Sequence, residues 1–248
     1  MMAKLTPLKS AEAPAGTRNV HPRAPTRGRG ILRYAALVDA TEALLQESVL
    51  DDVGLYQIAE RANVPPASVY HFFPTKEAAF LALTQRYLEG FSELRNAPVP
   101  AQYLASWQAL AAWDQLQAMN YYNSHLPALK LLLGGFGGIE TRQADRSYNE
   151  RNAASLYQRF NYIFHMPFMR DSAKTFHITM QILDAVWTIS YLKNGTITDE
   201  YYVESLSACI AYGRQFLPER IELREEYREA VERGEAIVIP GILSAMAE

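Results

Sequence analysis

The amino-acid sequence predicts an all-α protein, and three observations support that prediction. Apolar residues recur at three- and four-residue steps in nearly every segment after about residue 28, which is the period of an amphipathic helix. Prolines and glycines separate these periodic segments. The chain contains no convincing strand and no internal repeat. Helices of this kind bury their apolar faces against one another, which gives a helix-on-helix architecture.

Charge is distributed unevenly along the 248 residues. The net charge of −3 by itself argues against a nucleic-acid binder. Residues 1–33, however, sum to +6, so the remainder of the chain sums to −9. Residues 1–27 are rich in Ala, Pro, Thr and Arg without periodicity, and we interpret them as a flexible basic arm. Such arms often contact nucleic acid, and a tail without function is the open alternative.

Composition and spacing argue against several classes of site. The single cysteine, Cys209, permits no intramolecular disulfide or cysteine-rich zinc site, and its apolar surroundings indicate a buried thiol. The histidines do not fall at metal-ligand spacing, so we expect no metal and no cofactor. The glycines over 134–138 follow no strand and lack the lysine and serine of a phosphate loop. Without a long apolar run or a signal-like N-terminus, we expect a cytoplasmic protein and no membrane partner.

The N-terminal segment predicts three helices in quick succession. The first covers about 28–48, and a short second helix covers 55–62. A tight turn is expected at Asn63, because asparagine tolerates the left-handed conformation that ends a helix. The third helix covers 66–72 and begins at Pro66, since a proline lacks the N–H that would be unpaired there.

Beyond residue 75 every strong segment is predicted to be helical. Thr75 is the expected N-cap of a helix that runs to about residue 95, and prolines 98 and 100 then mark a domain boundary. An exposed amphipathic helix is expected over 219–233, and an apolar segment over 237–243 is expected to dock on a neighbour. The helices between them are predicted over about 101–123, 126–133, 139–164, 171–193 and 199–217.

The short helices over 55–62 and 66–72 have the size of a DNA-binding helix-turn-helix, in which one helix enters the major groove and its partner braces it. Helical pairs are common, so the residue types matter more than the pairing. The chain contains LVDA at 37–40, IAERANV at 58–64 and SVYHFFPTKE at 68–77. This pattern closely resembles the N-terminal domain of tetracycline-repressor (TetR) family transcriptional regulators. The C-terminal part resembles that family only in length and helical character.

The resemblance implies roles for individual residues in DNA binding. The helix over 66–72 would be the recognition helix. Tyr70, His71 and Lys76 occupy phosphate-contacting positions, and Lys76 adds an ammonium group to a helix N-terminus. Gln57 and Ala67 lie where side chains can approach base edges. The full set of expected DNA contacts is Arg29, Arg33, Gln57, Pro66, Ala67, Ser68, Tyr70, His71 and Lys76.

Three positions depart from the family pattern. Val49 stands where a glycine usually ends the first helix, so the following loop needs another shape. Asn63 replaces a common glycine, which is a conservative change. Pro65-Pro66 replaces a capping Ser or Thr and a polar residue. Base recognition would then depend on Gln57, Ser68 and apolar contacts between the start of the recognition helix and thymine methyl groups.

In this family the C-terminal helices form a ligand pocket and a dimer interface, so the resemblance implies both here. Small residues among bulky ones allow helices to approach closely, and an ordinary intramolecular core is the alternative to a dimer interface. The carboxylate of Asp184 could line the pocket or pair across the dimer. Core packing is the alternative for each aromatic candidate. The dimer candidates are Ile182, Ala185, Ile189, Ala208 and Ala211, and the pocket candidates are Trp113, Tyr121, Tyr157, Phe160, Phe164, Asp184 and Trp187.

The sequence therefore predicts a dimeric transcriptional regulator rather than an enzyme. We expect a repressor that binds a pseudo-palindromic DNA operator and is released by a small, mostly apolar ligand. A transcriptional activator or a ligand-independent regulator of the same family is the main alternative, and an enzyme with a helical N-terminal domain is a distant one. The expected divisions are a basic arm (1–27), a helix-turn-helix domain (28–74), a connecting helix (75–97), an effector-binding and dimerisation domain (98–217) and an amphipathic extension (218–248).

Overall fold

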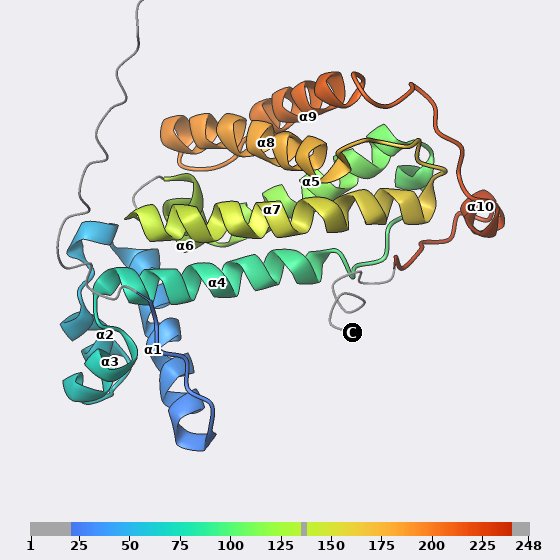
Figure 1. Cartoon of the computed structure of the whole chain (residues 1–248). Coiled ribbons are helices and arrows are strands. Elements are labelled where there is room, and N and C mark those ends of the chain that lie inside the picture. The colour runs from blue at the N-terminus through green and yellow to red at the C-terminus, as the bar shows by residue number, and fades with distance from the viewer. Residues whose placement is uncertain (1–20, 135–137, 240–248) are drawn as a thin grey trace, which may run out of the picture.

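The predicted all-α fold is confirmed by the computed structural model, which describes residues 21–134 and 138–239. Figure 1 shows a small group of helices, α1 to α3, at one end of the long helix α4, and a larger helical body alongside α4. We call residues 28–75 the head and residues 101–239 the body. The helices are α1 (Gly28–Glu47), α2 (Leu55–Arg61), α3 (Pro66–Phe72), α4 (Lys76–Leu94), α5 (Trp107–Ser124), α6 (Leu126–Ala128), α7 (Gly138–Ile163), α8 (Ser172–Asn194), α9 (Asp199–Gly213) and α10 (Glu225–Glu232), with short turns η1 (Leu50–Asp52), η2 (Ala101–Leu104) and the π-helical η3 (Leu129–Leu133).

The head folds around a small apolar core that α4 completes. Residues at helical spacing on α1, α2 and α3 turn inward, and the tilted rings of Tyr34 and Phe73 lie 5.2 Å apart. Thr75 caps α4 by accepting a hydrogen bond from the Ala78 N–H (3.3 Å), as predicted. Side chains with no exposed surface in this core are Leu37, Leu45, Ile58, Val69 and Phe73.

The body consists of long helices packed in layers. Helix α7 lies between α4 on one side and α8 on the other, and α9 packs on α8 (Figure 1). Trp187 of α8 is fully buried, and its indole N–H donates to the Ser205 hydroxyl of α9 (3.0 Å). Gly195 ends α8 with a φ of 74°, the left-handed conformation that glycine adopts readily because it has no Cβ.

Three predicted helix boundaries were wrong. The helix expected over 101–123 begins only at Trp107, because the Ser106 side chain caps it by accepting from the Ala109 N–H (3.1 Å). The helix expected over 199–217 ends at Gly213 and continues as turns, because Pro218 cannot extend a helix. The exposed helix expected over 219–233 is confined to α10, and the residues before it are extended.

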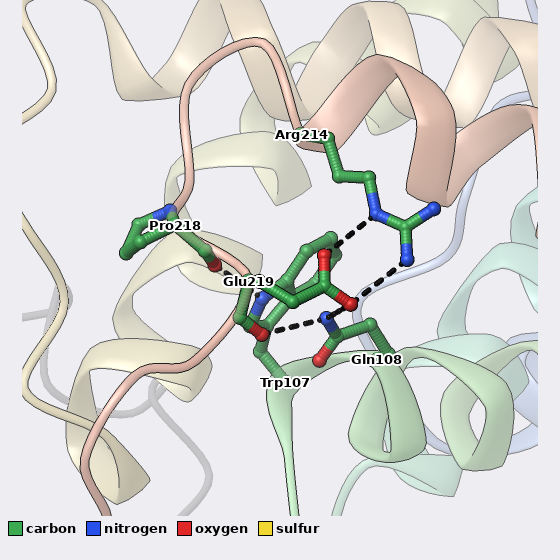
Figure 2. A network of polar contacts seen from close by, with 5 residues as sticks. All are labelled: Trp107, Gln108, Arg214, Pro218 and Glu219. Atoms are coloured by element: carbon green, nitrogen blue, oxygen red, sulfur yellow. Dashed lines mark hydrogen bonds and ion pairs between the residues drawn. The ribbon is translucent and has the colours of Figure 1, made fainter.

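The segment after α9 returns across the end of the body as a strap, which we define as residues 218–239. Figure 2 shows its anchor: the Trp107 indole donates to the Pro218 carbonyl (3.0 Å), and the Gln108 amide donates to the Glu219 carbonyl (2.9 Å). The Glu219 carboxylate also accepts from the guanidinium of Arg214 (2.9 Å). Further along, Ile237 pairs with Val99, so the described part of the terminal apolar segment docks on the chain itself.

Candidate nucleic-acid interface and ligand cavity

The turn between α2 and α3 holds the two helices as one rigid unit. Asn63 adopts a φ of 50°, which confirms the left-handed turn predicted at this position. The Val64 N–H then donates to the Ala59 carbonyl (3.0 Å), and Pro66 occupies the first turn of α3. The angle between the two helices is therefore set by the main chain as well as by the buried side chains.

The outward face of α3 carries most of the expected DNA contacts. Pro66, Ala67, Tyr70 and His71 are exposed, and Ser68 is half-buried. Tyr70 has 57% of its surface exposed, and its hydroxyl makes no hydrogen bond within the described residues. This face is thus open to a partner, while its contacts with DNA stay a prediction.

Gln57 has a structural role that the sequence analysis missed. Its side-chain carbonyl accepts from the Gly54 N–H (2.6 Å), and its amide donates to the Asp52 carbonyl (2.7 Å). The side chain therefore closes the first turn of α2, as the third residue of a capping box does. A Gln57 that reads a base edge would have to give up these contacts.

Lys76 is also engaged within the head. Its ammonium group donates to the carbonyls of Leu50 (3.3 Å) and Asp51 (3.4 Å), and it lies 4.0 Å from the Asp51 carboxylate. These distances are long, and the Asp51 side chain is fully exposed, so the contacts are weak. Lys76 sits at the N-terminus of α4, where an anion would be favoured, and its phosphate contact remains a prediction.

Exposed side chains also surround the predicted interface on α1 and α2. Arg29 and Arg33 lie in the first turns of α1, are exposed, and form no ion pair within the described residues. Tyr56, on the first turn of α2, is 70% exposed. The sequence analysis did not single out Tyr56, although a tyrosine that breaks the apolar pattern of an otherwise buried short helix could have indicated it.

Polar contacts join the head to α4. The Tyr87 hydroxyl donates to the Glu42 carboxylate (2.6 Å), and the Arg86 guanidinium bridges Glu42 (3.1 Å) and Asp39 (2.8 Å). Burial and the neighbouring Glu42 carboxylate together raise the pKa of Tyr87, so the phenol stays protonated and keeps its role as donor. Helix α1 is therefore fixed to the middle of α4.

Lys130 of η3 holds the other end of α1 to the body. Its ammonium group donates to the main-chain carbonyls of Leu45 (2.6 Å) and Ser48 (3.0 Å). The last carbonyls of a helix have no partner within the helix, and the helix dipole favours a cation there. Burial lowers the pKa of Lys130, so the cost of desolvation offsets part of this gain.

A cavity of about 170 Å³ lies between α4, α5, α7, α8 and α9. Leu88, Phe91 and Leu94 of α4, with Arg95 directly after it, form part of the wall, so the helix that carries the head also touches the cavity. Pockets that bind small molecules are typically apolar with a few polar groups, and this wall fits that description. Its aromatic members are Phe91, Trp107, Tyr122, Tyr148, Phe160, Phe176 and Trp187.

The charged groups of the cavity wall are held by neighbours. The Asp114 carboxylate accepts two hydrogen bonds from the buried Arg159 guanidinium, one from Nε (3.1 Å) and one from Nη2 (3.0 Å). Arg159 also donates to the Arg95 carbonyl at the end of α4 (2.9 Å). Asp184 accepts from the Asn149 amide (3.0 Å). The wall therefore carries both signs of charge in a mostly apolar setting.

Comparison with known proteins identifies the head. Residues 37–83 match the family model described as "Bacterial regulatory proteins, tetR family". The chain carries a TetR-family DNA-binding domain. TetR-family proteins are DNA-binding transcription regulators rather than enzymes, and the helix-turn-helix of this head is the element that such regulators use.

Solved structures of TetR-family regulators share the fold of this chain. A TetR-family transcriptional regulator from Streptomyces coelicolor aligns with a TM-score of 0.53 at 20% identity, over 77% of this chain and 100% of that one. A TetR regulator from Rhodococcus sp. RHA1 gives 0.53 at 15% identity, over 73% and 94%. SmeT, the repressor of a Stenotrophomonas maltophilia multidrug efflux pump, gives 0.53 at 14% identity, over 75% and 91%. A sequence comparison with curated proteins gave no match.

The TetR-like body brings together only some of the residues predicted for the pocket. Phe160, Asp184 and Trp187 line the cavity. The other four predicted residues do not line the cavity, because their rings pack elsewhere. Trp113 packs near Tyr103, and Tyr121 packs on Phe91. Tyr157 packs on Phe176, and Phe164 is buried beside the strap, where it pairs with Leu223.

The residues predicted for the dimer interface share one outward face of α8 and α9. Ala185 and Ala211 are exposed, Ile189 is 55% exposed, and Ile182 and Ala208 are half-buried. Leu192 of α8 and Val203 of α9 are also apolar and are 62% and 56% exposed. Within the described residues, no group of His, Cys, Asp and Glu could hold a metal ion, and no helix is long and apolar enough to cross a membrane.

Proposed function

We propose that the protein is a dimeric one-component transcriptional repressor that a small, mostly apolar ligand releases from DNA. The observation that carries the proposal is one helix, α4, which supports a TetR-family head at one end and lines an apolar cavity with its other half. Such a protein would act in the cytoplasm, where a bacterial operator is found. The divisions predicted from the sequence are retained, except that α4 serves both the head and the cavity.

Dimerisation is supported by the exposed apolar face of α8 and α9. Ile189, Leu192 and Val203 are exposed on these two neighbouring helices. Exposed apolar surface of this extent is unusual on a monomer, because burial against a partner removes it from water. Pairing this face with its copy around a twofold axis would give a self-complementary interface. The two heads would then meet half-sites about one helical turn apart, near 34–36 Å. Sedimentation of the purified chain should give the mass of two copies.

The DNA-binding part of the proposal is tested by Tyr70→Ala. We expect a several-fold to roughly tenfold loss of affinity for all duplexes with little change in salt dependence, because the lost phosphate contact is made by an uncharged hydroxyl and the number of phosphates neutralised by cations stays the same. The measurement is fluorescence anisotropy on a duplex that the wild-type protein selects from a random pool. The melting temperature should not change, since the Tyr70 side chain is exposed and makes no hydrogen bond within the described residues. Unchanged affinity would remove Tyr70 from the interface.

The size of the cavity limits the ligand that this conformation can hold. A cavity near 150 Å³ accommodates a molecule of about the size of benzene, so about 170 Å³ admits a ligand with one aromatic ring or a small bicyclic one. Cys209 lines this cavity, is the only cysteine of the chain, and is 4% exposed. Burial raises the pKa of its thiol to about 11, so alkylation near pH 8 should be slow and should report on access to the cavity.

Ligand binding can be tested with indole as a neutral probe. We expect saturating indole to slow alkylation of Cys209 by iodoacetamide severalfold and to raise the melting temperature. Ala118→Leu adds bulk to the cavity wall and should abolish both effects of indole while the protein remains folded. Alkylation that is insensitive to indole and to other single-ring aromatics, in a folded wild-type protein, would argue for a regulator without a ligand at this site.

Release from DNA would follow if the ligand favours one position of α4. A ligand shifts an equilibrium only by its different affinity for the two states. Because Phe91 and Leu94 contact the cavity while Tyr87 and Arg86 hold α1, a shift of α4 would carry the head with it. Two heads that move apart or together no longer match the spacing of the half-sites.

A further inference from the structure

The described part of the basic arm is seated on the recognition helix. Residues 21–27 run beside α1 toward its first turn (Figure 1). The Arg23 N–H donates to the Phe72 carbonyl at the last residue of α3 (2.9 Å). Pro25 packs so closely on α1 that a Cβ added at Gly30 would lie 3.1 Å from the Pro25 Cβ. The main chain thus fixes the position of this segment relative to α3.

This seated segment carries unneutralised positive charge. Residues 21–38 contain four arginines and no acidic residue, and Arg23, Arg27, Arg29 and Arg33 are all exposed. None of the four forms an ion pair or a side-chain hydrogen bond within the described residues. Other arginines of the head region behave differently: Arg61 pairs with Glu47 (2.6 Å), and Arg86 pairs with Asp39. The four arginines over residues 21–38 are therefore available to bind an external anion.

We propose that Arg23 and Arg27 form a second DNA contact, on the phosphates that flank the half-site occupied by α3. This inference rests on the proposed function. A helix that lies in the major groove is bordered by sugar-phosphate backbone, and a segment hydrogen-bonded to the end of that helix lies beside this border. Guanidinium groups suit phosphate oxygens because they can donate two parallel hydrogen bonds. The hydrogen bond to Phe72 orders the segment before DNA arrives, which lowers the entropy cost of the contact.

The test is the double variant Arg23→Ala/Arg27→Ala in the full-length protein. The probe is the duplex that the wild-type protein selects from a random pool, with at least ten base pairs beyond each half-site. Two lost phosphate contacts per head should flatten the plot of log affinity against log salt by about 1.8 per head and weaken binding about tenfold or more. Base preference within the half-site should not change, because phosphate contacts carry no direct sequence information.

Arg170→Ala/Arg220→Ala is the matched control. It removes the same charge from two exposed arginines of the body, which have no ion pair in the described residues, and it should leave the salt slope unchanged. An equal loss in both double variants would overturn the inference, because it would show an effect of net charge alone. Both variants should melt like the wild type.

Shortening the duplex locates the contact. We expect the wild-type protein to lose affinity when the flanking base pairs are removed up to the half-sites. The affinity of the Arg23→Ala/Arg27→Ala variant should not change on the same shortening. If the wild type binds its selected duplex but trimming and the arm substitutions have no effect, the arm contact is wrong and the proposed function stands. If the wild type selects no duplex from the pool, the proposed function itself fails.

Discussion

Arg159→Leu should lower the free energy of unfolding by about 3–5 kcal/mol, because it leaves the Asp114 carboxylate without its cation in a mostly buried site. The Arg159 side chain is 4% exposed and that of Asp114 20% exposed. Arg159 also satisfies the Arg95 carbonyl at the end of α4, so the substitution breaks the joint between α4, α5 and α7. Chemical denaturation of the purified variant measures the loss.

A double variant separates the lost pair from a general packing defect. Arg159→Leu/Asp114→Leu removes both charges, and replacing a buried pair by apolar groups is often close to neutral. We expect it to recover at least half of the stability lost in Arg159→Leu. A double variant as unstable as the single one would mean that the side-chain packing of Arg159, and not the unpaired carboxylate, explains the loss.

Trp187→Ala should destabilise the protein by a similar amount, about 3–5 kcal/mol, through the cavity that it leaves. The indole is fully buried, contacts Tyr122 edge-on with centroids 5.7 Å apart, and donates to Ser205. Because Trp187 lines the ligand cavity, the alanine variant should also accept larger aromatic probes than the wild type. Thermal melting and probe-induced shifts in melting temperature measure the two effects.

Trp187→Phe is a milder substitution at the same position, and its stability can be compared with that of Trp187→Ala. It keeps an aromatic ring in the core and loses the hydrogen bond to Ser205, so we expect a smaller cost of about 1–2 kcal/mol. Equal destabilisation in the two variants would assign most of the effect to the hydrogen bond. It would also contradict a dominant role for ring packing between α8 and α5.

Most of the head could be predicted from the sequence because its determinants are local. Asn63 favours the left-handed turn, Pro66 favours a helix start, and Thr75 favours a cap, each through the conformation of one or two residues. The boundaries of α1 and α3 followed from these signals together with apolar periodicity. The specific motif at residues 58–77 then indicated a TetR-family DNA-binding domain, which the family model over residues 37–83 bears out.

The body was less predictable because its determinants are contacts between distant residues. Three of the seven residues predicted for the pocket line the cavity, since a single sequence cannot say which of several inward aromatic rings meet a void and which meet each other. Gln57 was expected at a base edge, yet it caps α2. A glutamine amide can form hydrogen bonds with an external partner or with the nearby main chain, and the sequence does not distinguish the two. The apolar segment over 237–243 was expected to dock, but the partner of Ile237, Val99, lies about 140 residues earlier in the chain.

The contact between Lys130 and α1 bears on how such proteins can diverge. Both acceptors are main-chain carbonyls, so any helix that ends at the same point in space offers them, whatever its side chains are. Substitutions on the DNA-facing surface can therefore accumulate without loosening this joint, provided that the length of α1 is kept. The corollary is that heads with new operator preferences could be grafted onto this body more easily than heads with a longer or shorter first helix.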